Sequence, residues 1–423
     1  MSRRKNNLNR NLIRILIAMI VILLVLIASV YMGKKLEKDK SRNEDSTIIA
    51  GSESDKNVTD NSNLTSNNDS SQDKTSSNKS NNPPSIDDMD EQEEPSSPLT
   101  PSPTQAPAEP IILAFAGDVN FDENSKPVAR YDRENKGILG GISQELVDEM
   151  NQADIFMLNN EFAYSTRGSR IIEKSYTFRA HPNRIDILKE MGVDIVSLAN
   201  NHALDYGQDA LLDTFTTLEE AGIDYVGAGH NMDRAKSPVY YTIGDTKIGY
   251  VAASRVVYAM DWYATDDRPG MIGTYDPALF ISSIEEAKKN SDFVVAYVHW
   301  GVERSHEPVD YQKNMAKMYI DAGADLVIGC HPHVMQGIEF YKGKAIAYSL
   351  GNYWFNSSKR ESGLIKFYIN PDGTTDVQLL PVMNDNTYTY LITDESDRKA
   401  YFKFMEDISF DVKFDEDGFV TEK

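Results

Sequence analysis

The sequence predicts an α/β domain between residues 110 and 383, with a largely parallel sheet that is mixed or divided into two sheets. From Ile111 onward, short apolar runs alternate with amphipathic stretches, which is typical of strand–helix units. Glycines follow three of these stretches, where helices end: Gly192, Gly222 and Gly323. Turn sequences at Gly244-Asp245 and Pro371-Asp372-Gly373 add antiparallel hairpins to the parallel pattern.

Individual elements follow from the spacing of apolar residues. Strands are predicted at 111–116, 154–158, 193–198, 223–226, 239–243, 247–252, 293–298, 325–329 and 345–349. Helices are predicted at 143–153, 183–191, 208–221, 278–290 and 310–322. In the last three, apolar residues recur at three- and four-residue spacing, as in a helix with one buried face. Residues 384–423 form an acidic C-terminal extension in which the sequence predicts no element.

The N-terminal region predicts a membrane anchor. Residues 15–33 are uncharged and mostly apolar, and about 20 such residues cross a bilayer as a helix. The preceding residues 1–14 contain five Lys or Arg and no acidic residue, which places this tail in the cytoplasm and the large domain outside it. A cleaved secretory signal is the alternative, although its apolar core is usually only about 7 to 15 residues long. Export is expected in either case.

Residues 34–109 are predicted to be a disordered linker. Ser, Asn, Asp, Lys and Pro dominate this segment, so it contains too little apolar surface to offset the entropy of ordering. A spacer that lifts the domain off the membrane is one interpretation. Tolerated low-complexity sequence is the other, and the residues do not distinguish them.

Charge and cysteine content exclude several classes of function. The net charge is −22, which argues against nucleic acid as a partner and means that a polyanion needs a cation or a local arginine cluster to bind. The one cysteine, Cys330, excludes an intrachain disulfide and a thiolate metal cluster. We interpret Cys330 as a small buried apolar residue.

Five polar clusters each follow a predicted strand. They are Gly117-Asp118-Val119-Asn120, Asn159-Asn160-Glu161, Asn200-Asn201-His202, His299-Trp300-Gly301 and Cys330-His331-Pro332-His333. Each cluster alone is explained by an ordinary turn, cap or core residue. Because ligands bind at the carboxyl ends of strands in open α/β sheets, the five together predict a shared site. Carboxylates with neutral imidazoles suit a two-metal hydrolytic site. His331 and His333 are predicted to be extended, to point to the same side and to bind different metals.

Several longer motifs resemble the CapA-type capsule-synthesis family, whose members include poly-γ-glutamate synthesis proteins. The matching segments, which run in order from Asp118 to Asn352, are 117–121, 160–161, 176–180, 198–207, 227–229, 299–303, 323–325, 331–333 and 349–352. This family is in turn similar to calcineurin-like metallophosphoesterases. The resemblance implies their fold, a sandwich of two mixed β-sheets flanked by helices.

The resemblance also implies roles for individual residues. Asp118, Asn120 and His333 would bind a first metal, Asn201, His299 and His331 a second, and Glu161 would bridge the two. His202 would be the general acid or polarise the substrate. Asn120 stands in place of a histidine and Glu161 in place of a shorter aspartate, so the first metal site is expected to be the weaker one.

The expected cofactor is a divalent metal, manganese or zinc, as one ion or two. Arg179 is the candidate for holding a substrate carboxylate or phosphate, and Asp205 and Glu303 are candidates for orienting histidines. The expected function is synthesis or export of an anionic polymer such as poly-γ-glutamate, with the polymer or its precursor and membrane synthase subunits as partners. Two alternatives remain open: a cell-surface metal-dependent phosphoester hydrolase, and a non-catalytic assembly subunit.

Overall fold

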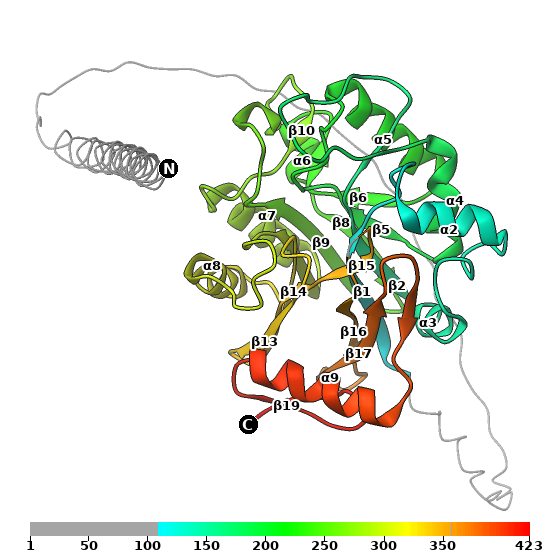
Figure 1. Cartoon of the computed structure of the whole chain (residues 1–423). Coiled ribbons are helices and arrows are strands. Elements are labelled where there is room, and N and C mark those ends of the chain that lie inside the picture. The colour runs from blue at the N-terminus through cyan, green and yellow to red at the C-terminus, as the bar shows by residue number, and fades with distance from the viewer. Residues whose placement is uncertain (1–108, 357) are drawn as a thin grey trace, which may run out of the picture. The chain divides into compact units, whose positions relative to one another are not determined.

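The computed structural model describes residues 109–356 and 358–423, whose arrangement is shown in Figure 1. The predicted cytoplasmic tail (1–14), the membrane helix (15–33) and all but the last residue of the linker (34–109) lie outside this part of the chain and stay predictions. In the part that is described, no helix combines the length and apolar character needed to cross a membrane.

The first sheet is mixed and has β1 (Ile111–Val119) at its centre. Its strand order is β18-β17-β16-β1-β2-β5-β6, and β15 also pairs with the end of β1. On one side of β1, the strands β2, β5 and β6 run parallel to it. On the other side, β16 is antiparallel to β1, and β17 is antiparallel to β16. Their bounds are β2 (Ile155–Asn160), β5 (Ile195–Ser197), β6 (Asp224–Val226), β15 (Asn352–Trp354), β16 (Arg360–Ile369), β17 (Thr375–Asn384) and β18 (Thr389–Leu391).

The second sheet has the order β13-β14-β12-β11-β9-β8. Its four inner strands are parallel, and both edge strands are antiparallel. Their bounds are β8 (Val239–Ile243), β9 (Thr246–Ser254), β11 (Phe293–His299), β12 (Leu326–Cys330), β13 (Met335–Tyr341) and β14 (Lys344–Leu350). The predicted α/β fold with mixed sheets is therefore confirmed.

Alternation along β11 shows how the two sheets pack. Val295 and Tyr297 belong to the core that the sheets share, whereas Val294, Ala296 and Val298 belong to a second core on the outer face. This alternation is expected because successive side chains of a strand point to opposite faces. The Tyr297 hydroxyl donates a hydrogen bond of 2.7 Å to the carbonyl of Ala116 in β1, which ties the second sheet to the first.

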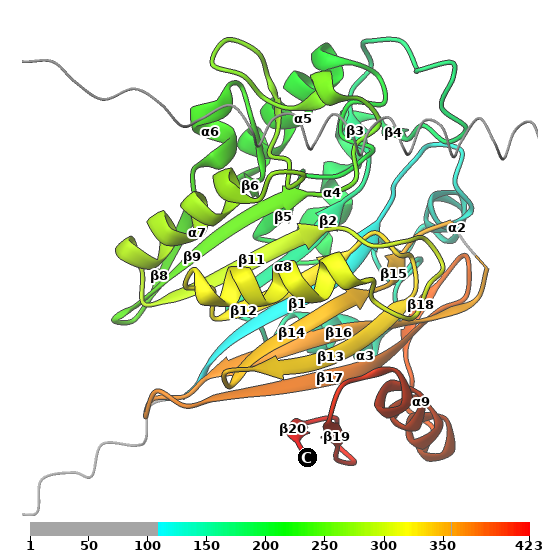
Figure 2. The ribbon, with the colours of Figure 1, turned by 90° about the vertical axis from the view of Figure 1, so that its left-hand side faces the viewer.

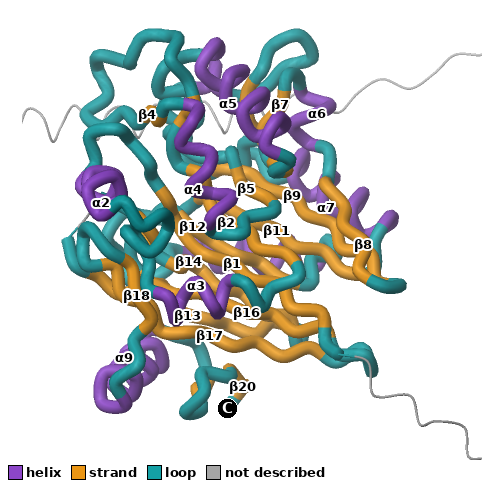
Figure 3. Tube along the Cα trace, turned by 90° about the vertical axis from the view of Figure 1, so that its right-hand side faces the viewer, coloured by secondary structure: helices purple, strands orange, loops and turns teal. Residues whose placement is uncertain are grey.

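Helices cover the outer faces. α7 (Ala278–Asn290) and α8 (Asp310–Asp321) lie over the second sheet, as Figure 2 shows. α3 (Gln144–Met150) and α4 (Ile185–Glu190) lie over the first sheet in Figure 3. The other helices are α2 (Lys126–Glu134), α5 (Gln208–Ala221), α6 (Met232–Lys236) and α9 (Glu395–Ile408), with the 3₁₀ turns η1 (Pro182–Arg184) and η2 (Met260–Trp262). Three small sheets join β3 (Ala163–Tyr164) to β4 (Arg179–Ala180), β7 (Ala228–Gly229) to β10 (Gly270–Met271), and β19 (Val412–Phe414) to β20 (Val420–Glu422).

The residues after 384, for which the sequence predicted no element, pack on the rest of the domain. β18 extends the first sheet by pairing with β17. α9 buries Tyr401, Phe402 and Met405, and the Tyr401 hydroxyl donates a 2.7 Å hydrogen bond to the Ser362 carbonyl. This segment therefore contributes apolar side chains to the main core.

A buried lysine provides a test of how α3 is held on the first sheet. Lys366 is 1% exposed, and its ammonium lies 2.5 Å from the Glu149 carboxylate and 3.0 Å from the Gln152 side-chain oxygen. Replacing Glu149 by leucine should lower the free energy of unfolding by about 1–3 kcal/mol, because the ammonium stays buried without its counter-charge. Lys366→Met should change it by less than about 1 kcal/mol, because Glu149 is partly exposed and can be hydrated.

Urea unfolding of the full chain would measure both changes. Equal losses in the two variants would contradict this account, since they would mean that the attraction within the pair outweighs the cost of burying the lysine.

Candidate metal centre

The parallel strands of both sheets carry their polar clusters at their carboxyl ends. Asp118 is the penultimate residue of β1, and Glu161 directly follows β2. His299 ends β11, and His331 directly follows β12. Since the two sheets pack face to face, these four strand ends lie at one edge of the sandwich.

Five of the predicted site residues converge there. The possible ligand atoms of Glu161, His299 and His331 lie within 4.8 Å of one another, and so do those of Asp118, Glu161 and His333. Glu161 belongs to both groups, as expected for a carboxylate between two ions. The expected convergence is found, and the role of each residue as a ligand stays a prediction.

The Glu161 carboxylate is at the centre of this cluster. Its Oε1 atom lies 3.8 Å from Nε2 of His299, 3.8 Å from Nε2 of His333 and 3.9 Å from Nε2 of His202. These separations are too long for hydrogen bonds. They match the spacing of two ligands of one ion, because zinc lies roughly 2.0–2.2 Å from carboxylate oxygen and imidazole nitrogen.

The loop that carries His331 and His333 differs from the prediction. Their φ angles are 96° and 58°, so the segment is a tight loop and the predicted extended conformation is wrong. The backbone N–H of His331 points to the Asp118 carboxylate at 3.3 Å. The rings still belong to different groups, His331 with Glu161 and His299, and His333 with Glu161 and Asp118.

A close approach of two loops places Asp118 beside His333. A Cβ atom on Gly117 would lie 2.0 Å from the Gly351 carbonyl oxygen, so only glycine fits there. The approach allows the Asp118 N–H to donate to Gly351 and pairs Asp118 with Asn352. His333 Nδ1 then lies 2.8 Å from Asn352 Oδ1 and 3.1 Å from Asp118 Oδ2.

Asn159 is a site residue that the sequence did not single out. Its side-chain amide donates to Asp118 Oδ1 at 2.8 Å and to Glu161 Oε2 at 3.3 Å, and its oxygen accepts from Asn200 at 3.0 Å. It therefore fixes both carboxylates relative to each other. The sequence signal was its place in the Asn159-Asn160-Glu161 cluster, but nothing in that pattern shows which asparagine faces inward.

The Asn201–Asp205 turn contributes three predicted residues. Asn201 Oδ1 lies 2.7 Å from His299 Nε2, within hydrogen-bond distance, so Asn201 reaches the cluster. His202 is 5% exposed, and its Nδ1 lies 2.7 Å from Asp205 Oδ2. The expected pairing of Asp205 with a histidine is therefore present. Lys174, which was not predicted from the sequence, also contacts this turn through His202.

Asn120 is buried nearby, and its side-chain oxygen takes part in a local turn. Asn120 Oδ1 accepts a hydrogen bond of 2.8 Å from the Asp122 N–H, in an Asx turn. Its side-chain NH₂ is buried and has no hydrogen-bond partner among the described residues. The hydrogen bond from Asp122 leaves one lone pair on Oδ1, and the role of Asn120 as a ligand stays a prediction.

The structure gives Arg179 and Glu303 no contact with the cluster. The Arg179 guanidinium lies 4.1 Å from the centre of the Tyr206 ring and donates to the Arg167 carbonyl. Glu303 is exposed and makes no described hydrogen bond or ion pair to a histidine of the cluster. Burial lowers the pKa of Lys174, and the charge of Glu303 acts to raise it.

The two carboxylates have opposite pKa shifts. Burial, reinforced by the charge of Asp118, raises the pKa of Glu161 well above its usual range. Burial also acts to raise the pKa of Asp118, but His333, Asn159 and His331 together outweigh it, so the pKa of Asp118 is lowered. Two anions this close need a cation between them if both are to be ionised.

The imidazoles are also perturbed. Burial and the neighbouring imidazoles lower the pKa of His299 well below its usual value and that of His331 to about 3. Burial opposes charge on His333 as well, but Glu161 and Asp118 raise its pKa to about 10. Burial lowers the pKa of His202 despite its contact with Asp205. His299 and His331 are therefore neutral at pH 7, the state in which imidazole binds metal.

Two unsatisfied atoms show that these residues fit a cation. Glu161 Oε1 and His331 Nδ1 are buried and have no hydrogen-bond partner among the described residues. Each such atom costs about 1–3 kcal/mol, and both belong to the group Glu161–His299–His331. Carboxylate and imidazole together suit manganese or zinc. Cys330 lies beside this group, with Sγ 3.2 Å from His299 Nδ1, and is fully buried as predicted.

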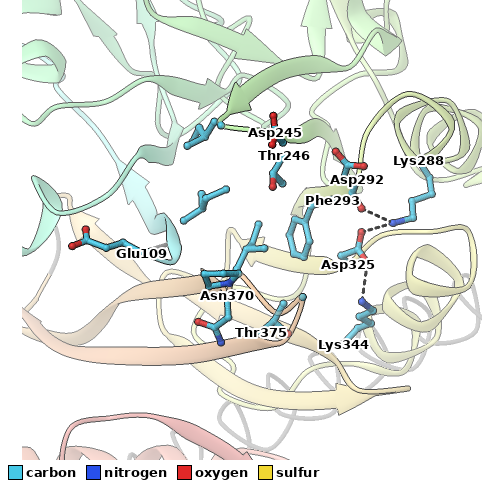
Figure 4. A pocket seen from close by; sticks show the side chains of 16 residues that line it. Glu109, Asp245, Thr246, Lys288, Asp292, Phe293, Asp325, Lys344, Asn370 and Thr375 are labelled. Carbon is cyan, nitrogen blue, oxygen red and sulfur yellow. Dashed lines mark hydrogen bonds and ion pairs between the residues drawn. The ribbon is translucent and has the colours of Figure 1, made fainter. Parts of the chain in front are cut away.

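A separate hollow lies at the other edge of the sheets. It has a volume of about 790 Å³ and is lined by the first residues of several strands, including Ile111, Phe293 and Lys344 (Figure 4). Asp325 in its wall is paired with both Lys288 and Lys344. The metal-ligand candidates are at the opposite ends of the same strands, so this hollow is not part of their site.

Comparison with known sequences places the chain among capsule-synthesis proteins. It is 35% identical over 217 residues to the PGA biosynthesis protein CapA of Bacillus subtilis, covering 50% of this chain and 56% of that protein. It is 34% identical over 217 residues to the capsule biosynthesis protein CapA of Bacillus anthracis, covering 50% and 52%. The match thus spans about half the length of these curated relatives.

Solved structures give weaker likenesses. A hypothetical protein of Thermus thermophilus aligns with a TM-score of 0.41 and 17% identity, covering 65% of this chain and 100% of that chain. The NAD nucleotidase of Haemophilus influenzae aligns with a TM-score of 0.39 and 10% identity, covering 71% and 63%. Scores this low establish neither fold nor activity.

The decisive match is to a whole family. The sequence model of the bacterial capsule synthesis protein family PGA_cap matches residues 112–357. This range includes every residue of the candidate site, from Asp118 to His333, and more than half of the chain. The chain therefore belongs to the PGA_cap family of bacterial capsule synthesis proteins.

Proposed function

We propose that this chain acts in the synthesis or export of an anionic capsule polymer of the poly-γ-glutamate type, through a hydrolytic site that requires a divalent cation. Family membership and the names of the two Bacillus relatives support the pathway. The observation that carries the chemistry is the unsatisfied Glu161 Oε1 among three imidazole nitrogens.

The cation is proposed to be manganese or zinc. Glu161, His299, His331 and Asn201 would hold one ion, and Asp118, Glu161 and His333 a second, weaker one. A bound cation of this kind polarises a substrate oxygen and lowers the pKa of a water molecule. The likeness to calcineurin-like metallophosphoesterases belongs to this proposal, and two stacked mixed sheets with the site at their strand ends support it.

His202 is proposed to move the proton. With its Nδ1–H donating to Asp205, the Nε2 atom is left facing Glu161 at 3.9 Å. Nε2 can then take a proton from the attacking group or return one to the leaving group. The Phe178 ring packs against the His202 ring in a tilted arrangement, with the ring centres 4.3 Å apart.

The location is proposed from the sequence. The predicted helix at residues 15–33 would anchor the chain, and the linker would hold the domain on the outer side of the membrane. A membrane synthase subunit is the expected protein partner there.

Metal analysis and a turnover assay on the full chain would test the proposal. We expect manganese or zinc to copurify, bis(4-nitrophenyl) phosphate to be hydrolysed, and His202→Ala to abolish capsule in the host. An absence of metal, together with normal capsule in His299→Ala and His331→Ala hosts, would refute it.

A non-catalytic assembly subunit is the second candidate. Asn120 favours it, because this neutral side chain stands in place of a histidine and its Oδ1 also accepts a hydrogen bond from Asp122, so the first metal would be held more weakly. Metal content without turnover, and capsule retained in the His202→Ala host, would support this role instead.

A further inference from the structure

Lys174 lies in the loop between β3 and β4, which is held at several points against the Asn201–Asp205 turn and α5. The Ile171 N–H donates to the Asp205 carbonyl at 3.0 Å. Arg167 is paired with Asp213 of α5. Exposed apolar residues flank Lys174, with Ile172 79% and Tyr176 70% exposed. The lysine instead turns inward, and its side chain is only 11% exposed.

The Lys174 ammonium has three contacts, all within one turn. It donates to the Asn201 carbonyl, lies 2.5 Å from Asp205 Oδ1, and lies 3.1 Å from His202 Nδ1. These three residues include a candidate metal ligand, the candidate proton carrier and its carboxylate partner. No other cation in the part of the chain that is described contacts all three.

The hydrogen bonds around Asp205 fix the orientation of His202. Asp205 Oδ2 accepts from the Phe178 N–H at 2.7 Å and faces His202 Nδ1 at 2.7 Å. With the His202 Nδ1–H donating to Oδ2, the Lys174 ammonium binds the other carboxylate oxygen and so fixes the orientation of the carboxylate. Nε2 then remains free on the side of Glu161.

We infer that Lys174 is a positioning residue of this site, which holds the Asn201–Asp205 turn so that Asn201 Oδ1 and His202 Nε2 both face the cluster. The inference rests on the proposed function and adds a residue to it. Without the ammonium, the buried Asp205 carboxylate and the Asn201 carbonyl lose a donor, and the turn must rearrange to recover one. The Trp262 ring, 5.3 Å from the ammonium, adds a cation–π contact from another loop.

A simpler role is attachment of the loop alone. In that case removing Lys174 lowers thermal stability but leaves His202 and the metal as they are. The two roles therefore differ in what happens to the His202 ring in folded protein.

Histidine-labelled full chain would show the difference by nitrogen NMR. The sequence has seven histidines, and the signal missing from a His202→Gln variant identifies His202. We expect one Nδ1–H form in the wild type and in Arg170→Met, which removes an exposed cation from the same loop. We expect mixed or broadened His202 signals in Lys174→Met and in Lys174→Gln. Glutamine keeps a hydrogen-bond donor, so Lys174→Gln is the variant to use if Lys174→Met fails to fold.

Kinetics give a second readout. With bis(4-nitrophenyl) phosphate, Lys174→Met should lower kcat about 10–100-fold, the usual loss for a residue that orients a metal-site group, while KM stays constant. Metal affinity should fall as well, because the same turn carries Asn201. Unchanged His202 signals in the folded variants would overturn the inference. If the wild type shows no turnover, the hydrolytic proposal fails, and the His202 signals alone decide the role of Lys174.

Discussion

Replacing Glu161 by glutamine should weaken binding of manganese or zinc at least about 100-fold, or about 2.8 kcal/mol. Glu161 belongs to two of the three groups of candidate ligands among the described residues, so both of these lose their shared anion. Glutamine has nearly the same shape, and the neutral side chain avoids the cost of a buried charge beside Asp118. The apo protein should therefore stay folded, and the loss should appear in metal binding alone.

Thermal unfolding with and without added metal would separate the two effects. Metal at 100 times its dissociation constant stabilises a folded protein by about 2.7 kcal/mol, which should appear as a higher melting temperature in the wild type and vanish in Glu161→Gln. Glu303→Gln is the matched control, because this carboxylate is exposed. A metal-dependent rise in the Glu161→Gln melting temperature equal to that of the wild type would rule out Glu161 as a ligand.

Replacing His202 by glutamine should lower turnover of bis(4-nitrophenyl) phosphate about 100- to 10,000-fold, the range for loss of a proton-transfer group. Metal content should not change, because the groups of candidate ligands do not include His202. Phosphodiester turnover and metal content, measured on the same preparation, would test both statements.

His181→Gln is the matched control for this change. His181 is exposed, and its side chain hydrogen-bonds only to Asn183 among the described residues, so its replacement should leave turnover unaltered. Loss of metal from His202→Gln would show that His202 is itself a ligand, contrary to its assigned role.

Helices and strands were predictable where apolar residues recur at regular spacing. Predicted helices 208–221 and 278–290 coincide with α5 and α7. α2 was missed because it buries only Pro127 and Val128 and so has no apolar stripe. The acidic C-terminal segment gave no prediction because α9 alternates charged residues with the aromatics that it buries against the sheet.

The site was predictable as a set of strand ends, but its details depend on tertiary contacts. Parallel pairing brings Asp118, Glu161, His299 and His331 to one edge, and the sequence shows which strands they follow. It does not show that the Asp122 N–H donates a hydrogen bond to Asn120 Oδ1, or that the Arg179 guanidinium packs on the Tyr206 ring. Lys174 was overlooked because an isolated lysine in a polar loop looks solvent-exposed until the fold places a buried turn beneath it.

The candidate ligands are divided between the two sheets. Asp118 and Glu161 belong to strands of the first sheet, and His299 and His331 to strands of the second. Each of the two proposed ions would therefore have ligands from both sheets and would hold the sheets together. Separating the sheets would break the coordination of the ions. Chelating agents should therefore lower the stability of the whole domain as well as abolish its activity.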